Sequence, residues 1–128
     1  MNELIIDAVK ENIFFTFIAS KATYSVKHNN SKTNYEQLMT LIIDFLSSKN
    51  LDLKEISSIY VNRGPGSFAG IRNSISIAKA LHLAQKIDYY CFSLGDFKGE
   101  HSIKLENIPN LCDKFKVKKN LINPVYLS

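Results

Sequence analysis

The chain has 128 residues, of which 45% are hydrophobic and 22% are charged, and its formal net charge is +4. This length allows one domain with its own core, and no apolar run approaches the ~20 residues that cross a bilayer. Glu3 and Asp7 lie near the start, where a secretory signal would be basic and then apolar, so we expect a cytoplasmic protein without membrane contact.

Three apolar segments open the chain and predict three short strands. They cover residues 3–8, 12–18 and 23–27, and they are bounded by polar or small residues. The turns between them are short, which favours an antiparallel meander.

A helix is predicted over residues 34–48, after a polar loop at 28–32. Thr33 and Glu36 have the spacing of a capping box, which satisfies backbone N–H groups at a helix start. Apolar residues at helical spacing give this helix one buried face. That face includes Tyr35, Leu38, Met39 and Ile42.

The most informative segment is Gly64–Arg72, which follows an apolar strand at 58–61 and opens a second helix. A strand, a glycine-rich turn and a helix in that order place backbone N–H groups at a helix N-terminus, where anions bind. The spacing G-x-G-x-x-x-G matches neither the dinucleotide fingerprint nor a P-loop. A purely structural interpretation is that the glycines supply unusual φ angles and Pro65 stiffens the turn. The motif loop consists of Gly64, Pro65, Gly66, Ser67, Phe68, Gly70 and Arg72.

The helix after this loop, Phe68–Gln85, is apolar over a wide arc. Only Arg72, Ser76 and Lys79 form a clear polar sector. A helix that covers a sheet needs one apolar stripe of roughly 100° or somewhat more, so this helix requires more protein around it or a partner. Its apolar arc includes Ile71, Ile75, Ile77, Ala78 and Leu81, with His82 beside them.

A strand at 88–94 follows, and residues 96–120 are expected to be irregular with one short helix. The element order is then β-β-β-α-β-α-β, an α/β fold with a mixed sheet and both helices over one face. This order describes the RNase H-like half-domain of the actin/sugar-kinase (ASKHA) superfamily. Four lysines between residues 114 and 119 are expected to form a solvated tail, and a phosphate-contacting patch is the alternative.

The string Gly64–Arg72 resembles the G-P-G-S-F-T-G-L-R signature of the bacterial TsaB (YeaZ) family, with Ala69 and Ile71 in place of threonine and leucine. The similarity covers about residues 3–97, and Pro124–Leu127 resembles the family's terminal P-x-Y-L. Family members usually carry a second lobe. We therefore expect a TsaB-type domain over residues 1–97 and a reduced remnant of the second lobe over 98–128, which is not a separate domain.

The resemblance implies a non-catalytic scaffold that binds a TsaD-like subunit, which modifies adenosine 37 of tRNA with a threonylcarbamoyl group. A TsaE-like ATPase is a further expected member of that complex, and contact with tRNA is expected to be indirect or weak. Pairing would use the two helices. The implied partner contacts are Tyr35, Leu38, Met39, Ile42, Ile71, Ile75, Ile77, Ala78, Leu81 and His82.

No catalytic residue, metal or cofactor is expected. The three histidines lack the H-x-x-x-H spacing of TsaD-like metal sites, and Cys91 and Cys112 are too few for a zinc site. Ala8 and Val9 stand where the family has D-T-S hydroxyls after Asp7, so we do not expect ATP binding. Peptidase activity is not expected either, because the sequence indicates neither a metal site nor a nucleophile.

Two alternatives stay open. One is a small nucleotide-binding, phosphotransferase-like protein that uses the loop at 64–70. The other is a homodimeric interaction module whose helices pair with each other.

Overall fold

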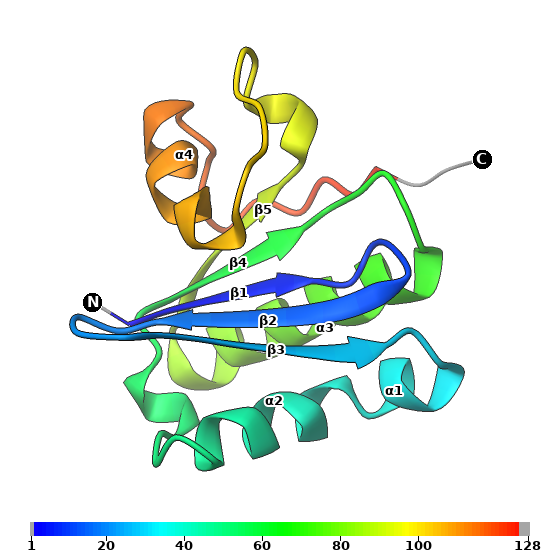
Figure 1. The fold of residues 1–128 in the computed structure, drawn as a ribbon, viewed down its shortest axis with the longest axis vertical. Coiled ribbons are helices and arrows are strands. Elements are labelled where there is room, and N and C mark those ends of the chain that lie inside the picture. Colours follow the sequence, from blue (N-terminus) through cyan, green and yellow to red (C-terminus); the bar gives the residue numbers. More distant parts are fainter. Residues whose placement is uncertain (1, 126–128) are drawn as a thin grey trace.

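The computed structural model describes residues 2–125, and it contains a five-stranded mixed sheet in the order β3-β2-β1-β4-β5 (Figure 1). The first three strands form the predicted antiparallel meander, while β4 runs parallel to β1 and β5 parallel to β4. This confirms the expected mixed sheet and the order β-β-β-α-β-α-β. The strands are β1 (Glu3–Asp7), β2 (Asn12–Ile18), β3 (Thr23–Asn29), β4 (Ser58–Asn62) and β5 (Asp88–Phe92).

Three helices, α1 (Lys32–Glu36), α2 (Leu38–Ser47) and α3 (Phe68–Gln85), cover one face of the sheet (Figure 1). Alternate residues of β1 point to opposite faces, so Leu4 and Ile6 belong to the cluster under these helices, whereas Ile5 belongs to a cluster on the other face. Both faces of β1 are therefore buried, which explains its continuous apolar run. No described helix is long and apolar enough to cross a membrane.

The first helical region differs from its prediction in two ways. Ser31 is the N-cap of α1, and its Oγ accepts a hydrogen bond from the backbone N–H of Asn34 at 3.1 Å, so the capping box predicted at Thr33 and Glu36 is wrong. Pairing with β2 extends β3 to Asn29, and α1 begins at Lys32, so only residues 30 and 31 of the predicted loop remain. The helix then breaks at Gln37, whose φ of −105° and ψ of 23° separate α1 from α2.

The C-terminal segment covers the second face of the sheet. It contains two 3-10 turns (Leu94–Asp96 and Leu105–Asn107) and one short helix, α4 (Ile108–Lys114), as the sequence predicted. The second cluster comprises Ile5, Tyr60, Phe92, Phe97, Ile108, Leu111 and Cys112. The lysines at 114–119 are exposed to solvent, as predicted, but they lie on a segment packed against the sheet and not on a tail.

Beyond α4 the chain follows the outer side of β5 and returns to the start of the motif loop. Lys119 forms an antiparallel bridge with Tyr90, and the Asn120 N–H donates to the carbonyl of Tyr89 at 2.7 Å. The Val125 N–H donates to the carbonyl of Arg63 at 2.7 Å. The sequence similarity at Tyr126 and beyond lies outside the described residues.

Candidate functional site: the motif loop and the helical face

The motif loop leaves β4 through a tight turn that requires glycine at its first position. Gly64 has a φ of 107°, and its peptide bond to Pro65 is cis. Its N–H donates to Oδ1 of the buried Asn62 at 3.0 Å. A Cβ at Gly64 would lie 2.0 Å from the carbonyl oxygen of Val125, so backbone conformation and space both exclude a side chain here.

The other two motif glycines are needed for close backbone approach. A Cβ at Gly66 would lie 2.3 Å from the carbonyl oxygen of Val9, and one at Gly70 would lie 1.7 Å from that of Ala8. The Ser67 N–H donates to the Val9 carbonyl at 2.8 Å. The prediction of an unusual φ is therefore confirmed at Gly64 and wrong at Gly66, where proximity is the reason for glycine.

The N-terminus of α3 is capped from within the chain. Oγ of Ser67 caps the helix by accepting a hydrogen bond from the Gly70 N–H at 3.2 Å. Within the helix, Oγ of Ser74 donates a hydrogen bond to the Gly70 carbonyl at 2.6 Å. The turn that the loop contacts contains Ala8 and Val9, which are 1% and 4% exposed. The loop thus acts as a structural junction that joins β1, β4 and α3.

Burial shifts the pKa of one carboxyl and of both cysteine thiols. Burial raises the pKa of the Asp7 carboxyl, an effect opposed by the Val9 N–H and the Asn62 side chain. Burial raises the pKa of the Cys91 thiol to about 11 and that of Cys112 to about 12, so both are protonated thiols at neutral pH. Within residues 2–125, no three His, Cys, Asp or Glu side chains gather as metal ligands.

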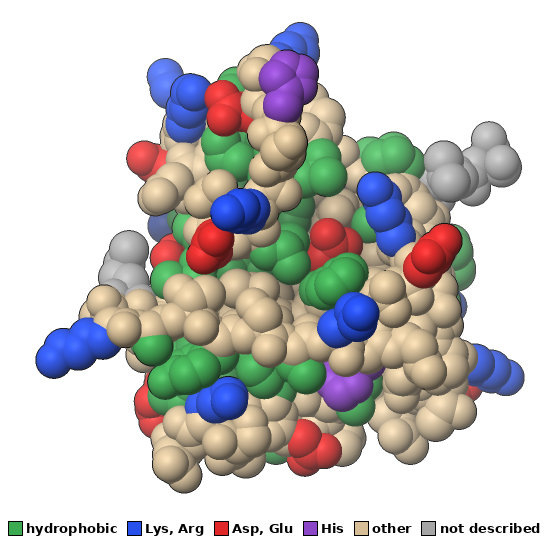
Figure 2. Space-filling view, in the orientation of Figure 1, with side chains coloured by type: hydrophobic (Ala, Val, Ile, Leu, Met, Phe, Trp, Pro, Cys, Tyr) green, Lys and Arg blue, Asp and Glu red, His purple; other side chains and the backbone are tan. Residues whose placement is uncertain are grey.

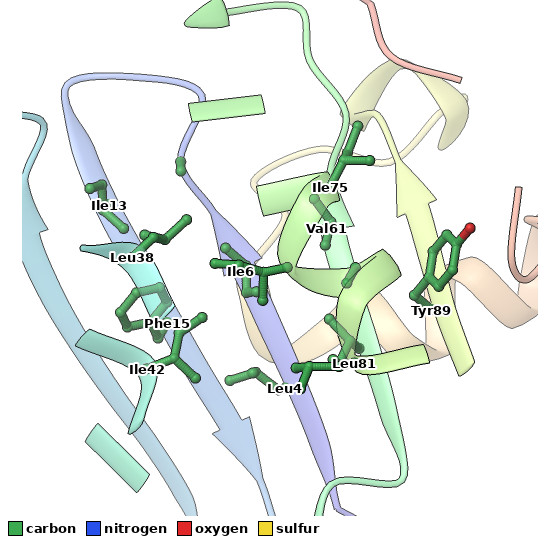
Figure 3. Close-up of a cluster of buried hydrophobic side chains, with 14 of the residues drawn as sticks. Leu4, Ile6, Ile13, Phe15, Leu38, Ile42, Val61, Ile75, Leu81 and Tyr89 are labelled. Atoms are coloured by element: carbon green, nitrogen blue, oxygen red, sulfur yellow. The ribbon is translucent and has the colours of Figure 1, made fainter. Parts of the chain in front are cut away.

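Most of the residues predicted to contact a partner are enclosed within this chain. Figure 3 shows Leu38 and Ile42 beside Phe15 of β2, and Leu81 beside Leu4 of β1. Because α3 packs on the sheet and also beside α1 and α2, its wide apolar arc is covered by the chain itself. The assignment of these side chains to a partner surface is corrected accordingly. Those at most 8% exposed are Tyr35, Leu38, Ile42, Ile71, Ile75, Ile77, Ala78 and Leu81.

The two remaining predicted contacts, Met39 and His82, are half-buried. Met39 packs against the same core. The Nδ1 atom of His82 lies 2.9 Å from the carbonyl oxygen of Ile87, and its ring stands edge-on to Tyr89 at 5.5 Å between centroids. His82 therefore has a structural role at the end of α3.

The helical layer exposes a different set of apolar side chains. Leu83 is 73% exposed and Phe68 57% exposed on α3, and Ile43 is 42% exposed on α2. Sequence reasoning missed Leu83 and Ile43 as surface residues. A signal was present for Leu83, because at about 100° per residue it falls in the polar sector between Arg72 and Ser76.

An apolar hollow of about 300 Å³ lies at the C-terminal ends of α2 and α3. Ile43 and Leu46 of α2, Gln85 of α3, and Leu51 and Leu53 of the connection to β4 are among its lining residues. The helical face therefore combines exposed apolar side chains with a concave apolar end, which suits the binding of a helix or loop from another protein.

Comparison with known proteins places these features in a family context. A model of the family described as "TsaD: tRNA N6-adenosine threonylcarbamoyltransferase" matches residues 20–93. The "tRNA threonylcarbamoyladenosine biosynthesis protein TsaB" of Buchnera aphidicola subsp. Schizaphis graminum is 31% identical over 90 residues, which are 70% of this chain and 43% of that protein. The chain thus spans less than half the length of this relative.

Two solved structures share the fold. YeaZ from Pseudomonas aeruginosa superposes with a TM-score of 0.67 at 22% identity, over 75% of this chain and 46% of that one. RuvC from Thermus thermophilus superposes with a TM-score of 0.52 at 8% identity, over 92% of this chain and 82% of that one. The RNase H-like architecture expected from the element order is therefore confirmed.

Proposed function

The chain belongs to the TsaB (YeaZ) family, and from this premise we propose that it acts in tRNA threonylcarbamoyladenosine biosynthesis as a non-catalytic subunit. In this role it binds a TsaD-like catalytic subunit through the exposed face of α2 and α3. The partner's own helices cover that face.

The exposed apolar face of the helical layer is the observation that supports this proposal most strongly. Leu83, Phe68 and Ile43 are large apolar side chains with 42–73% of their surface exposed. Between Phe68 and Leu83 the outward positions of α3 include the cations Arg72 and Lys79, and also Ser76 and Ala80, which are small and would let a partner helix approach closely. Such a combination is typical of helix–helix association.

A non-catalytic role agrees with the chemistry of the motif loop. The glycines hold the loop against the turn at Ala8 and Val9, and Ser67 uses its hydroxyl to cap α3. Burial keeps the two cysteines protonated. The loop residues therefore fix the position of α3, and α3 presents the proposed binding face.

The test is co-purification of the tagged chain with the TsaD-like subunit of the same genome. Leu83→Glu is expected to lower the recovered subunit at least tenfold, because it places a charge in an apolar interface. The matched control is Ile122→Glu, which alters an apolar residue that is 39% exposed away from the helical layer. This variant is expected to retain pairing.

Circular dichroism and thermal melting establish that both variants are folded. Equal recovery of the partner with Leu83→Glu and with the unaltered chain would contradict the proposed face. If Leu83→Glu instead converts a homodimer into a monomer and recovery of the TsaD-like subunit is unchanged, the homodimeric module becomes the better description.

A further inference from the structure

A basic groove of about 350 Å³ lies on the side of the molecule formed by the C-terminal segment. It runs between the turn after β5 and the chain that follows α4. Arg63, Asp96, Lys98, Lys116 and Lys118 supply its charged lining. Figure 2 shows Lys and Arg side chains, with Asp and Glu side chains among them, on the part of the molecule that carries α4.

The carboxylate in this groove is already neutralised. Oδ1 of Asp96 accepts from Nη2 of Arg63 at 2.7 Å, and Oδ2 accepts from the Ser93 N–H at 2.9 Å. Arg63 is fixed further, because Nη1 donates to the carbonyl of Asn123 at 3.1 Å. Arg63 and Asp96 therefore form the rigid, electrically balanced floor of the groove.

The three lysines of the groove are not paired with a carboxylate among the described residues. Among the described residues, Lys98, Lys116 and Lys118 have no carboxylate within 4.0 Å. The neighbouring lysines differ, since Lys114 pairs with Glu100 at 3.1 Å and Lys119 with Asp88 at 3.6 Å. The groove therefore carries three lysines without a paired carboxylate, next to the balanced pair of Arg63 and Asp96.

The charge of the whole chain is distributed in the same way. Residues 98–128 contain six lysines and three carboxylates, a net charge of +3. Residues 1–97 contain ten basic and nine acidic residues, a net charge of +1. Most of the net charge thus belongs to about a quarter of the chain, which attracts polyanions to this side.

The lysines are also held on a folded scaffold. Lys116 adopts a left-handed φ of 55° just after α4, where its N–H donates to the carbonyl of Asp113 at 3.2 Å. Lys116 borders a second hollow of about 620 Å³, which contains Tyr90 stacked on Tyr60 at 4.8 Å between ring centroids. Tyr90 is half-buried, so part of its ring is available to a flat ligand group.

We propose that this groove binds the phosphate backbone of RNA, with Lys98, Lys116 and Lys118 as the phosphate contacts. Lysines near a partly exposed tyrosine suit a nucleic acid better than an acidic peptide, since a base can stack where a phosphate is bound next to it. The identity of that RNA as tRNA rests on the proposed function. The groove and the helical face are formed by different elements, so the two roles can be tested separately.

The test uses the full chain and a fluorescein-labelled, unmodified tRNA transcript, with anisotropy measured between about 50 and 200 mM salt. The groove variant combines Lys98→Gln, Lys116→Asn and Lys118→Gln, with asparagine chosen because it tolerates the left-handed conformation. Affinity is expected to fall at least tenfold. The slope of log K against log salt is expected to become shallower by roughly two to three, the contribution of three phosphate contacts.

The matched control combines Lys21→Gln, Lys27→Gln and Lys54→Gln, which removes the same charge at exposed sites elsewhere. It is expected to retain most of the affinity and the salt slope. Equal losses in both variants, or no tRNA binding by the unaltered chain, would overturn the proposal. Binding of a polyglutamate peptide as tightly as tRNA through the same three lysines would overturn it in favour of an acidic protein partner.

Lys98→Glu alone is a second variant, and it lies in a loop where folding is not at risk. It is expected to weaken tRNA binding more than Lys27→Glu does. Co-purification of the TsaD-like subunit is measured in parallel. The groove variant should retain the protein partner and Leu83→Glu should retain tRNA, so failure of one proposal is distinguishable from failure of the other.

Discussion

At the scale of single residues, the motif loop shows that one residue type can be required for different reasons. Gly64 is needed for a positive φ, whereas Gly66 and Gly70 are needed because carbonyl oxygens of Val9 and Ala8 occupy the space of a side chain. The sequence indicated that glycine was important at these positions. It did not indicate the reason, because the opposing residues lie more than fifty positions away in the chain.

Gly70→Ala is predicted to destabilise the fold. The new methyl group would lie 1.7 Å from a backbone oxygen, so β1 or α3 must shift, at a cost of about 1–3 kcal/mol in the free energy of unfolding. Gly95→Ala is the matched control, since its Cβ would lie 3.8 Å from the nearest neighbouring side-chain atom, Oγ of Ser93, and the expected change is within about 0.5 kcal/mol. Urea unfolding measures both. Equal stabilities of the two variants would show that the loop can adjust without cost.

At the scale of elements, the bounds of α3 could be predicted from the sequence, but its surroundings could not. Periodicity identifies which positions of a helix are apolar. It does not identify whether a sheet, a neighbouring helix or another protein covers them. The arc that includes Ile77 and Leu81 therefore suggested a partner, although the chain's own sheet and helices bury both residues.

The first helical region was less predictable for a local reason. Ser31 and Thr33 both precede Asn34 and both are suitable capping residues. Pairing of β3 with β2 determines where the strand ends, and this leaves Ser31 at the N-cap. The break at Gln37 has no proline or glycine to mark it.

Leu81 and Leu83 provide a direct test of the burial pattern on α3. Leu81→Ala is expected to lower the free energy of unfolding by about 2–5 kcal/mol, because it leaves a cavity above β1. Leu83→Ala is expected to change it by less than about 0.5 kcal/mol, because that side chain is 73% exposed. Chemical unfolding of both variants is the measurement. A loss at Leu83 as large as that at Leu81 would mean that the helix is rotated relative to this structure.

At the scale of the whole molecule, the sheet is covered on both faces by parts of the same chain. The sequence indicated a reduced segment after residue 97 but not where that segment lies. Its apolar residues Ile108, Leu111 and Cys112 are few and have no strong periodicity, so their packing against Ile5 and Tyr60 could not be inferred. The extent of the domain at 1–97 remains a prediction.

Ile108→Asp is predicted to disrupt this second layer. The side chain is 0% exposed, so the substitution buries a charge without a partner and is expected to cost about 4 kcal/mol or more. Asn110→Asp adds the same charge at an exposed position of α4 and should leave the melting temperature nearly unchanged. Thermal melting with a dye that binds exposed apolar surface measures both effects. Similar melting of the two variants would show that the second layer contributes little to stability.

The position of Ile5 has a consequence for synthesis of the chain. Ile5 shares a buried cluster with Ile108 and Leu111, which are made more than a hundred residues later. Contacts across such a long separation must close a loop of more than a hundred residues before they contribute any energy. During translation, the sheet face that carries Ile5 therefore stays exposed until residues 108–112 have been made. Protection of this face by a chaperone is most valuable in that interval.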